Sequence, residues 1–97
     1  MLKFENNSFD HLMEAVALLN TPEECKAFFE DLCTIKEIQD MSQRFETAVM
    51  LSNGQNYQTI LSSIGTSTAT ISRVNRCLQY GSSGYKTAIN RLKEKEE

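Results

Sequence analysis

The stretch that decides the expected fold runs from Tyr57 to Arg73 and reads YQTILSSIGTSTATISR. A helix-turn-helix needs a short first helix, a turn that contains glycine, and a second helix packed across the first. Gly65 supplies the turn, and the residues that would pack the two helices together are Leu61, Ile64 and Ile71. We therefore predict a helix-turn-helix over residues 56–80, whose second helix, the recognition helix, begins near Ser67.

The side chains between the apolar positions of this recognition helix are small, hydroxylated or basic. Short side chains let a helix approach base edges, hydroxyls bond phosphates or bases, and methyl groups contact the thymine methyl. The residues predicted to contact double-stranded DNA are Gln58, Thr66, Ser67, Thr68, Ala69, Thr70, Ser72, Arg73 and Arg76. Leu61 departs from the usual pattern, which prefers a small residue there. The pattern alone therefore leaves open a helical protein-protein interaction module that does not bind DNA.

The charge distribution agrees with a nucleic-acid partner, although the net charge is −3. Residues 1–42 carry nine acids and three lysines, whereas residues 43–97 carry seven basic residues and four acids. The segment from Gln55 to Tyr80 holds Arg73 and Arg76 and no acid. Affinity for phosphate depends on the local face of a protein and not on its total charge. A chance fluctuation in a short chain remains the alternative explanation.

Two capping boxes predict the starts of two further helices. In such a box a threonine caps the helix and a glutamate three residues later bonds back toward the cap. The members are Thr21, Pro22 and Glu24 in the first box, with Pro22 as the first helical residue, and Thr34 and Glu37 in the second. The helix that follows Thr34 should run to about Ser52, because Asn53 and Gly54 tolerate the left-handed geometry of a helix end.

Helices are also expected at the two ends of the chain. Ser8 is predicted to cap the first, and the last should run from Tyr85 to about Lys95. The first helix has an apolar stripe broad enough to need a partner surface, formed by Phe9, Leu12, Met13, Val16 and Leu19 and widened by Ala15 and Leu18. The inward residues predicted for the long helix after Thr34 are Ile38, Met41, Phe45, Ala48, Val49 and Leu51. The expected fold is a single all-α domain over residues 1–97.

The chain shows no sign of a membrane protein, a secreted protein or an enzyme. No apolar run approaches the ~20 residues of a membrane span, and Met1–Asn6 lacks the charge and apolar run of a secretory signal. We therefore expect a cytoplasmic protein without a membrane partner. Its cysteines, which are Cys25, Cys33 and Cys77, form no CxxC pair and are interpreted as reduced core residues. His11 is the single histidine and is expected to be structural or exposed, so we predict no metal, no cofactor and no catalytic site.

Several of these residues together resemble the Trp repressor superfamily, in its YerC/YecD-type branch. The similarity covers at least Leu32 to Leu78. The residues that carry it are Leu32 to Thr34 at a helix start, Arg44, Gly54, Ile64 with Gly65, and Ala69 to Arg73. The segment between Gly54 and Gly65 is one residue shorter than in the repressor itself, and the first thirty residues match only in helical character.

This resemblance implies a six-helix subunit in an intertwined homodimer that regulates transcription, most simply as a repressor. In the family, tryptophan lies between two arginines, which correspond here to Arg44 and Arg73. Val74 stands where the repressor has glycine, and it should crowd the indole space at a cost of ~1–3 kcal/mol. The candidate effector pocket comprises Thr34, Arg44, Arg73, Val74 and Cys77. We therefore expect a different small-molecule co-effector, or none, in place of tryptophan.

Overall fold

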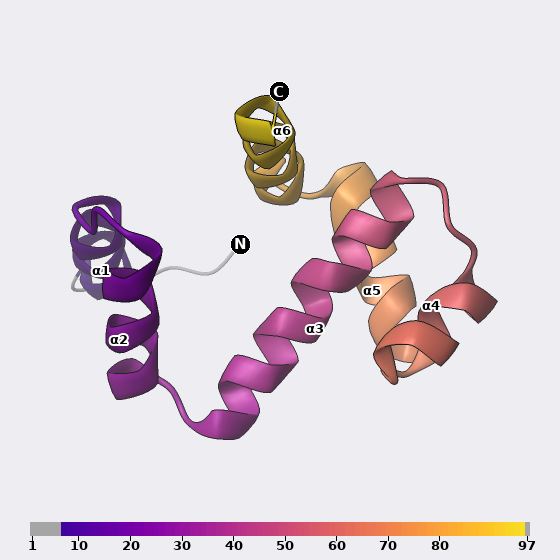
Figure 1. The fold of residues 1–97 in the computed structure, drawn as a ribbon, viewed down its shortest axis with the longest axis horizontal. Helices are drawn as coiled ribbons and strands as arrows, with labels where there is room; N and C mark the ends of the chain where they lie inside the picture. Colours follow the sequence, from indigo (N-terminus) through magenta and orange to yellow (C-terminus); the bar gives the residue numbers. More distant parts are fainter. Residues whose placement is uncertain (1–6, 97) are drawn as a thin grey trace. The chain divides into compact units, whose positions relative to one another are not determined.

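The structure, a computed structural model, describes residues 7–96, which form six helices and contain no strand (Figure 1). The helices are α1 Ser8–Ala17, α2 Pro22–Leu32, α3 Ile35–Ser52, α4 Tyr57–Ile64, α5 Thr68–Tyr80 and α6 Gly84–Glu96. The predicted all-α fold is confirmed. None of these helices is long and apolar enough to cross a membrane. The absence of a secretory signal in Met1–Asn6 concerns residues outside those described.

The predicted capping box at the start of α3 is present, and that at the start of α2 is present only in its threonine cap. At the start of α3 the N–H of Glu37 donates to the Thr34 hydroxyl at 3.1 Å, and the N–H of Thr34 donates to the Glu37 carboxylate at 2.8 Å. At the start of α2 the N–H of Glu24 donates to the Thr21 hydroxyl at 3.1 Å. The Glu24 carboxylate accepts instead from the N–H of Asn20, at 2.9 Å, one residue before the cap. These bonds satisfy N–H groups that helix formation leaves without partners.

The prediction that Ser8 caps α1 is wrong. Ser8 is the first helical residue, and the N-cap is Asn7, which has a left-handed φ of 57° and no side-chain capping bond. The end of α1 also falls short of the predicted stripe, since Leu18 and Leu19 lie beyond Ala17. Their N–H groups bond to the carbonyls three residues back, which tightens the last turn and stops the α-helical pattern. Leu18 is 77% exposed, whereas Leu19 is half-buried.

The chain divides into two compact units, one up to Ile38 and one from Gln39 onward, here called the N-terminal unit and the C-terminal unit. No described residue of the N-terminal unit is fully buried. Phe28 and Phe29 of α2 pack edge to face, with ring centroids 5.6 Å apart, but both rings stay half-exposed. Whether the two units make the predicted single domain stays a prediction, because compactness within a chain does not establish independent folding.

The C-terminal unit has a buried core shared by three helices. Ala48 of α3, Val74 of α5 and Ile89 of α6 form it, and the partly buried residues packed against it are Phe45, Val49, Leu51, Leu78 and Tyr85. Four of the six predicted inward residues of α3 thus belong to this core. Ile38 is only half-buried in the other unit, and the inward prediction for Met41 is wrong, since it is 38% exposed.

Thr47 is a buried residue that the sequence analysis missed. It is fully buried on α3, although its side chain is polar. Its hydroxyl donates to the carbonyl of Gln43, at 2.7 Å, one turn earlier. This bond satisfies the hydroxyl within the helix, and so removes most of the penalty for burying it.

The cysteine prediction holds in part. All three cysteines are free, and Cys25 and Cys33 are half-buried. Cys77, however, is exposed, so its assignment to the core is wrong. The apolar stripe of α5 follows Ile71, Val74 and Leu78, and Cys77 lies to one side of that stripe.

Candidate nucleic-acid interface

The short helix, glycine turn and second helix expected from the sequence are all present in the C-terminal unit. The Asn56 side chain starts α4 by accepting from the N–H of Thr59 at 2.9 Å. Gly65 ends α4 with a φ of 78°, a left-handed conformation that glycine adopts without strain. Ser67 caps α5, since its hydroxyl oxygen accepts from the N–H of Thr70 at 3.1 Å. The cap role of Asn56 was not predicted, although asparagine before a helical pattern is a recognisable signal.

Two buried faces orient α5. The helix packs against both α4 and α6, and Ile71 and Val74 are its buried residues. On the α4 side, Ile60 is fully buried. Because residues four apart share a helix face, Thr68, Ser72 and Arg76 line the side of α5 opposite this buried stripe. The polar face of the recognition helix therefore points away from the core.

Most of the predicted DNA-contacting residues are exposed. They are Gln58, Ser67, Thr68, Ala69, Ser72, Arg73 and Arg76. Thr66 and Thr70 are half-buried. The Ser67 hydroxyl also donates to the Thr70 hydroxyl at 3.1 Å, so this pair already has a role in starting α5. Their contacts with DNA, like those of the exposed residues, stay predictions.

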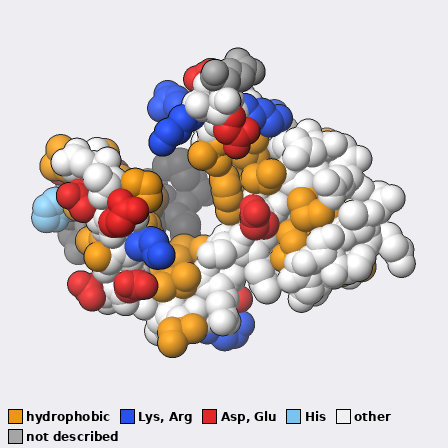
Figure 2. Space-filling model, viewed as in Figure 1, with side chains coloured by type: hydrophobic (Ala, Val, Ile, Leu, Met, Phe, Trp, Pro, Cys, Tyr) orange, Lys and Arg blue, Asp and Glu red, His pale blue; other side chains and the backbone are white. Residues whose placement is uncertain are grey.

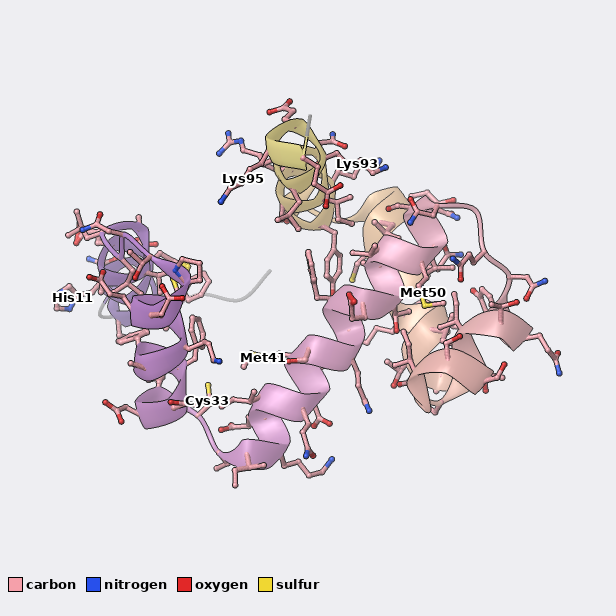
Figure 3. The ribbon with its side chains drawn as sticks, in the orientation of Figure 1. His11, Cys33, Met41, Met50, Lys93 and Lys95 are labelled. Atoms are coloured by element: carbon pink, nitrogen blue, oxygen red, sulfur yellow. The ribbon has the colours of Figure 1, made fainter. Side chains whose placement is uncertain are left out.

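The surface of the helix-turn-helix is free of acidic side chains from Gln55 to Tyr80. Figure 2 shows mainly uncharged polar surface over α4, with no Asp or Glu in that part of the view. A shallow hollow between α3 and α4 includes Met50, which is labelled in Figure 3. Its lining is Ser42, Gln43, Glu46, Met50, Ser63 and Ile64, and includes none of the predicted site residues.

The candidate effector residues do not all fall in one unit. Thr34 belongs to the N-terminal unit, where its hydroxyl caps α3. The other four belong to the C-terminal unit, where Arg44, Arg73 and Cys77 are exposed and Val74 is buried. Arg44 lies one helical turn before Ala48, which packs in the same core as Val74. The assignment of these residues to an effector pocket stays a prediction.

His11 is exposed on α1 and is labelled in Figure 3. Within the described part of the chain, no group of three or more histidine, cysteine or carboxylate side chains could hold a metal ion.

Comparisons with known proteins agree with this geometry. Residues 7–93 match the family described as Trp repressor protein. The uncharacterized protein YerC of Bacillus subtilis (strain 168) is 49% identical over 94 residues, which cover 97% of this chain and 90% of that protein. The structure of a candidate Trp repressor of Staphylococcus aureus matches with a TM-score of 0.87 and 45% identity, over 92% of this chain and 89% of that chain. A TrpR-like protein of Eubacterium eligens ATCC 27750 matches with a TM-score of 0.85 and 46% identity, over 91% of each chain. The chain therefore belongs to the Trp repressor family, in its YerC-related branch.

Proposed function

We propose that this protein is a sequence-specific, DNA-binding transcriptional regulator that acts as a homodimer, most simply as a repressor. The observation that carries the proposal is the exposed, acid-free face of α5, with Thr68, Ser72, Arg73 and Arg76 opposite a buried stripe. Membership of the Trp repressor family supports the same conclusion.

In this proposal α5 enters the major groove and its first turns meet the base edges. The small side chains at Thr68, Ala69 and Ser72 permit close approach, and their methyl and hydroxyl groups contact bases. Arg73 and Arg76 bind a phosphate or the O6 and N7 atoms of guanine. Gln58 lies in the first turn of α4, the helix that crosses the DNA backbone in this motif, and contacts a phosphate.

The exposed apolar surface of the N-terminal unit supports the homodimer. Five of its apolar side chains keep between 41% and 78% of their surface exposed within one chain; they are Phe9, Met13, Leu18, Leu32 and Ile35. Monomeric proteins rarely leave so many apolar side chains uncovered in one small region. A second copy would cover this surface, and a dimer with two recognition helices would bind a pseudo-palindromic operator whose half-sites lie about one helical turn of DNA apart.

The alternative is a helical protein-protein interaction module, with the acidic N-terminal half facing a basic partner. That alternative predicts an acidic or neutral recognition face, or one buried against the chain. The exposed basic face of α5 favours DNA instead.

Mobility-shift titration of genomic DNA fragments over a series of salt concentrations tests the proposal. We expect a shift at low salt, specific fragments retained at higher salt, and an affinity that falls as a power of the salt concentration. Selection of bound sequences from a random DNA pool should then return a two-fold symmetric site, and light scattering should give the mass of a dimer. Absence of any shift at low salt would rule out the DNA-binding function and leave the interaction module.

A further inference from the structure

We infer that α5 recognises A·T base pairs of its operator through the methyl group of thymine, which contacts Thr68 and Ala69, and not through hydrogen bonds to adenine. This readout rests on the proposed function, since it specifies which base edges the recognition helix contacts there. It follows from which side chains of α5 are exposed, which of their polar atoms already have partners, and how far each lies from the start of the helix.

The start of α5 carries methyl groups on exposed side chains. Thr68 is the first residue of the helix and Ala69 the second, and both are exposed. The hydroxyls beside them are already used in starting the helix. The Ser67 hydroxyl accepts the N–H of Thr70 and donates its one proton to the Thr70 hydroxyl, both at 3.1 Å. Because the N-terminal residues of a recognition helix meet the base edges, the groups brought closest to the bases include two methyl groups.

Recognition of adenine in the major groove needs a different kind of side chain. An Asn or Gln pairs with adenine through N6 and N7 together, which a single hydroxyl or methyl group cannot do. The exposed side chains in the first two turns of α5 are Thr68, Ala69, Ser72 and Arg73, and none of them is an amide. Ser72 adds one hydroxyl, which can bond to either base of a pair and so does not discriminate between them.

The two amides of α5 lie too far along the helix to read adenine. Asn75 is half-buried, and its side-chain oxygen accepts from the Gln79 amide at 3.5 Å. At a rise of about 1.5 Å per residue, Gln79 lies about 16 Å from Thr68 along the helix axis, whereas the major groove is only about 8.5 Å deep. A helix that enters by its first turns leaves the Gln79 amide outside the groove. The thymine methyl is then the feature of an A·T pair that α5 can contact specifically.

The experiment uses the full-length protein and the duplex that it binds most tightly in a selection from a random DNA pool. Each thymine of the selected site is replaced by deoxyuridine, which lacks only the methyl group, one position at a time and symmetrically in both half-sites. In a parallel set each adenine is replaced by 7-deazaadenine, which lacks the N7 acceptor. Mobility shift at one salt concentration gives the affinity for every duplex.

The protein variants remove the inferred methyl contacts one at a time. They are Thr68→Ser and Ala69→Gly, and their controls are Thr87→Ser and Ala88→Gly. Thr87 and Ala88 form the same dipeptide at exposed positions of α6, outside the helix-turn-helix. The controls therefore delete the same methyl groups from a helix, with a similar loss of helix propensity. An effect on helix stability alone should appear in both pairs of variants.

We expect deoxyuridine to weaken binding of the wild-type protein at one or two positions, by about tenfold when both half-sites lack the methyl group. 7-Deazaadenine should change affinity by less than about twofold, since no bidentate contact is lost. In Thr68→Ser and in Ala69→Gly, the effect of deoxyuridine at one of these positions should shrink to about twofold or less, because the two methyl groups form one contact. The α6 controls should keep the full wild-type response.

Three results would overturn the inference. One is a selected site without thymine, or one in which no deoxyuridine replacement weakens binding of the wild-type protein. Another is a loss with 7-deazaadenine as large as that with deoxyuridine, because an amide such as that of Gln58 would then read adenine. The third is a full deoxyuridine response in both Thr68→Ser and Ala69→Gly, because another residue would then contact the methyl group.

Failure of the proposed function gives a different result. In that case the wild-type protein shifts no DNA at low salt and selects no site from the random pool. This outcome is distinguishable, because it appears before any base or residue is replaced.

Discussion

The N-terminal and C-terminal units are both made of amphipathic helices with good caps, but only one of them buries side chains. In the C-terminal unit Ala48, Ile60, Ile71, Val74 and Ile89 are all at most 3% exposed. In the N-terminal unit no described residue is fully buried. Similar amphipathic helices thus form a buried core in the C-terminal unit but not in the described part of the N-terminal unit. The C-terminal unit therefore completes its core within one chain, and in the proposed homodimer a second chain would cover the N-terminal helices.

The largest expected effect comes from a charge placed on the apolar stripe of α1. Val16 is half-buried there. A symmetric interface contains Val16 of both copies, so Val16→Glu would bury two unpaired charges. Each unpaired buried charge costs about 3–5 kcal/mol, so the free energy of dimer dissociation should fall by about 6–10 kcal/mol. We expect light scattering to show monomer at micromolar concentration, and DNA affinity to fall by about a hundredfold or more, since both half-sites are no longer held together.

His11→Glu is the control for this prediction, because it adds the same charge at an exposed position on the side of α1 away from Phe9, Met13 and Val16. It should leave the dimer intact. A Val16→Glu protein that keeps the dimer mass would show that α1 is not part of the interface.

The second prediction tests the core of the helix-turn-helix. Ile60 is fully buried on α4, so Ile60→Ala should lower the free energy of unfolding by about 2–5 kcal/mol, through lost burial and a cavity. Urea unfolding measures this loss. Ile35→Ala is the paired variant, because Ile35 is 78% exposed in the single chain. A loss at Ile35 as large as that at Ile60 would mean that a partner chain buries Ile35.

Arg73→Ala should have a smaller effect, which weakens DNA binding and leaves the free energy of unfolding unchanged. Loss of one arginine contact typically costs about 1–3 kcal/mol, which weakens DNA binding about five- to 150-fold. If Arg73 binds a phosphate, the slope of log affinity against log salt should also fall by about one. Arg91→Ala removes the same charge from α6, away from the helix-turn-helix, and should change affinity little. Unchanged affinity in Arg73→Ala would remove this residue from the interface.

The smallest expected effects are at the two N-caps with matched geometry. Ser67 caps α5 and Thr34 caps α3, each by accepting a backbone N–H at 3.1 Å. Ser67→Ala and Thr34→Ala should each lower the free energy of unfolding by about 1 kcal/mol. Thermal unfolding at one fixed protein concentration measures both. A loss at Ser67 alone would indicate that the cap of α3 is compensated by other contacts.

Local signals in the sequence predicted the helices well. The caps at Thr21 and Thr34 and the left-handed turn at Gly65 each depend on bonds or backbone angles within about four residues, so the sequence alone contains what is needed to find them. Membership of the family was equally visible, because the run from Ala69 to Arg73 is short and contiguous. The wrong prediction of the cap at Ser8 also has a local cause. The N-cap is the preceding residue, Asn7, which adopts a left-handed conformation.

Burial was decided by the tertiary structure. An apolar pattern marks one side of a helix but not which of its residues meet a neighbour, and so Met41 and Cys77 were wrongly placed inward and Thr47 was missed. Val74 is the clearest case. The family resemblance assigned it to an effector pocket, and the structure adds that it packs with Ala48 of α3 and Ile89 of α6. Sequence alone thus determined the helices and the acid-free recognition face of α5. Only tertiary packing determined which side chains hold that face in place, because burial depends on residues far apart in the chain.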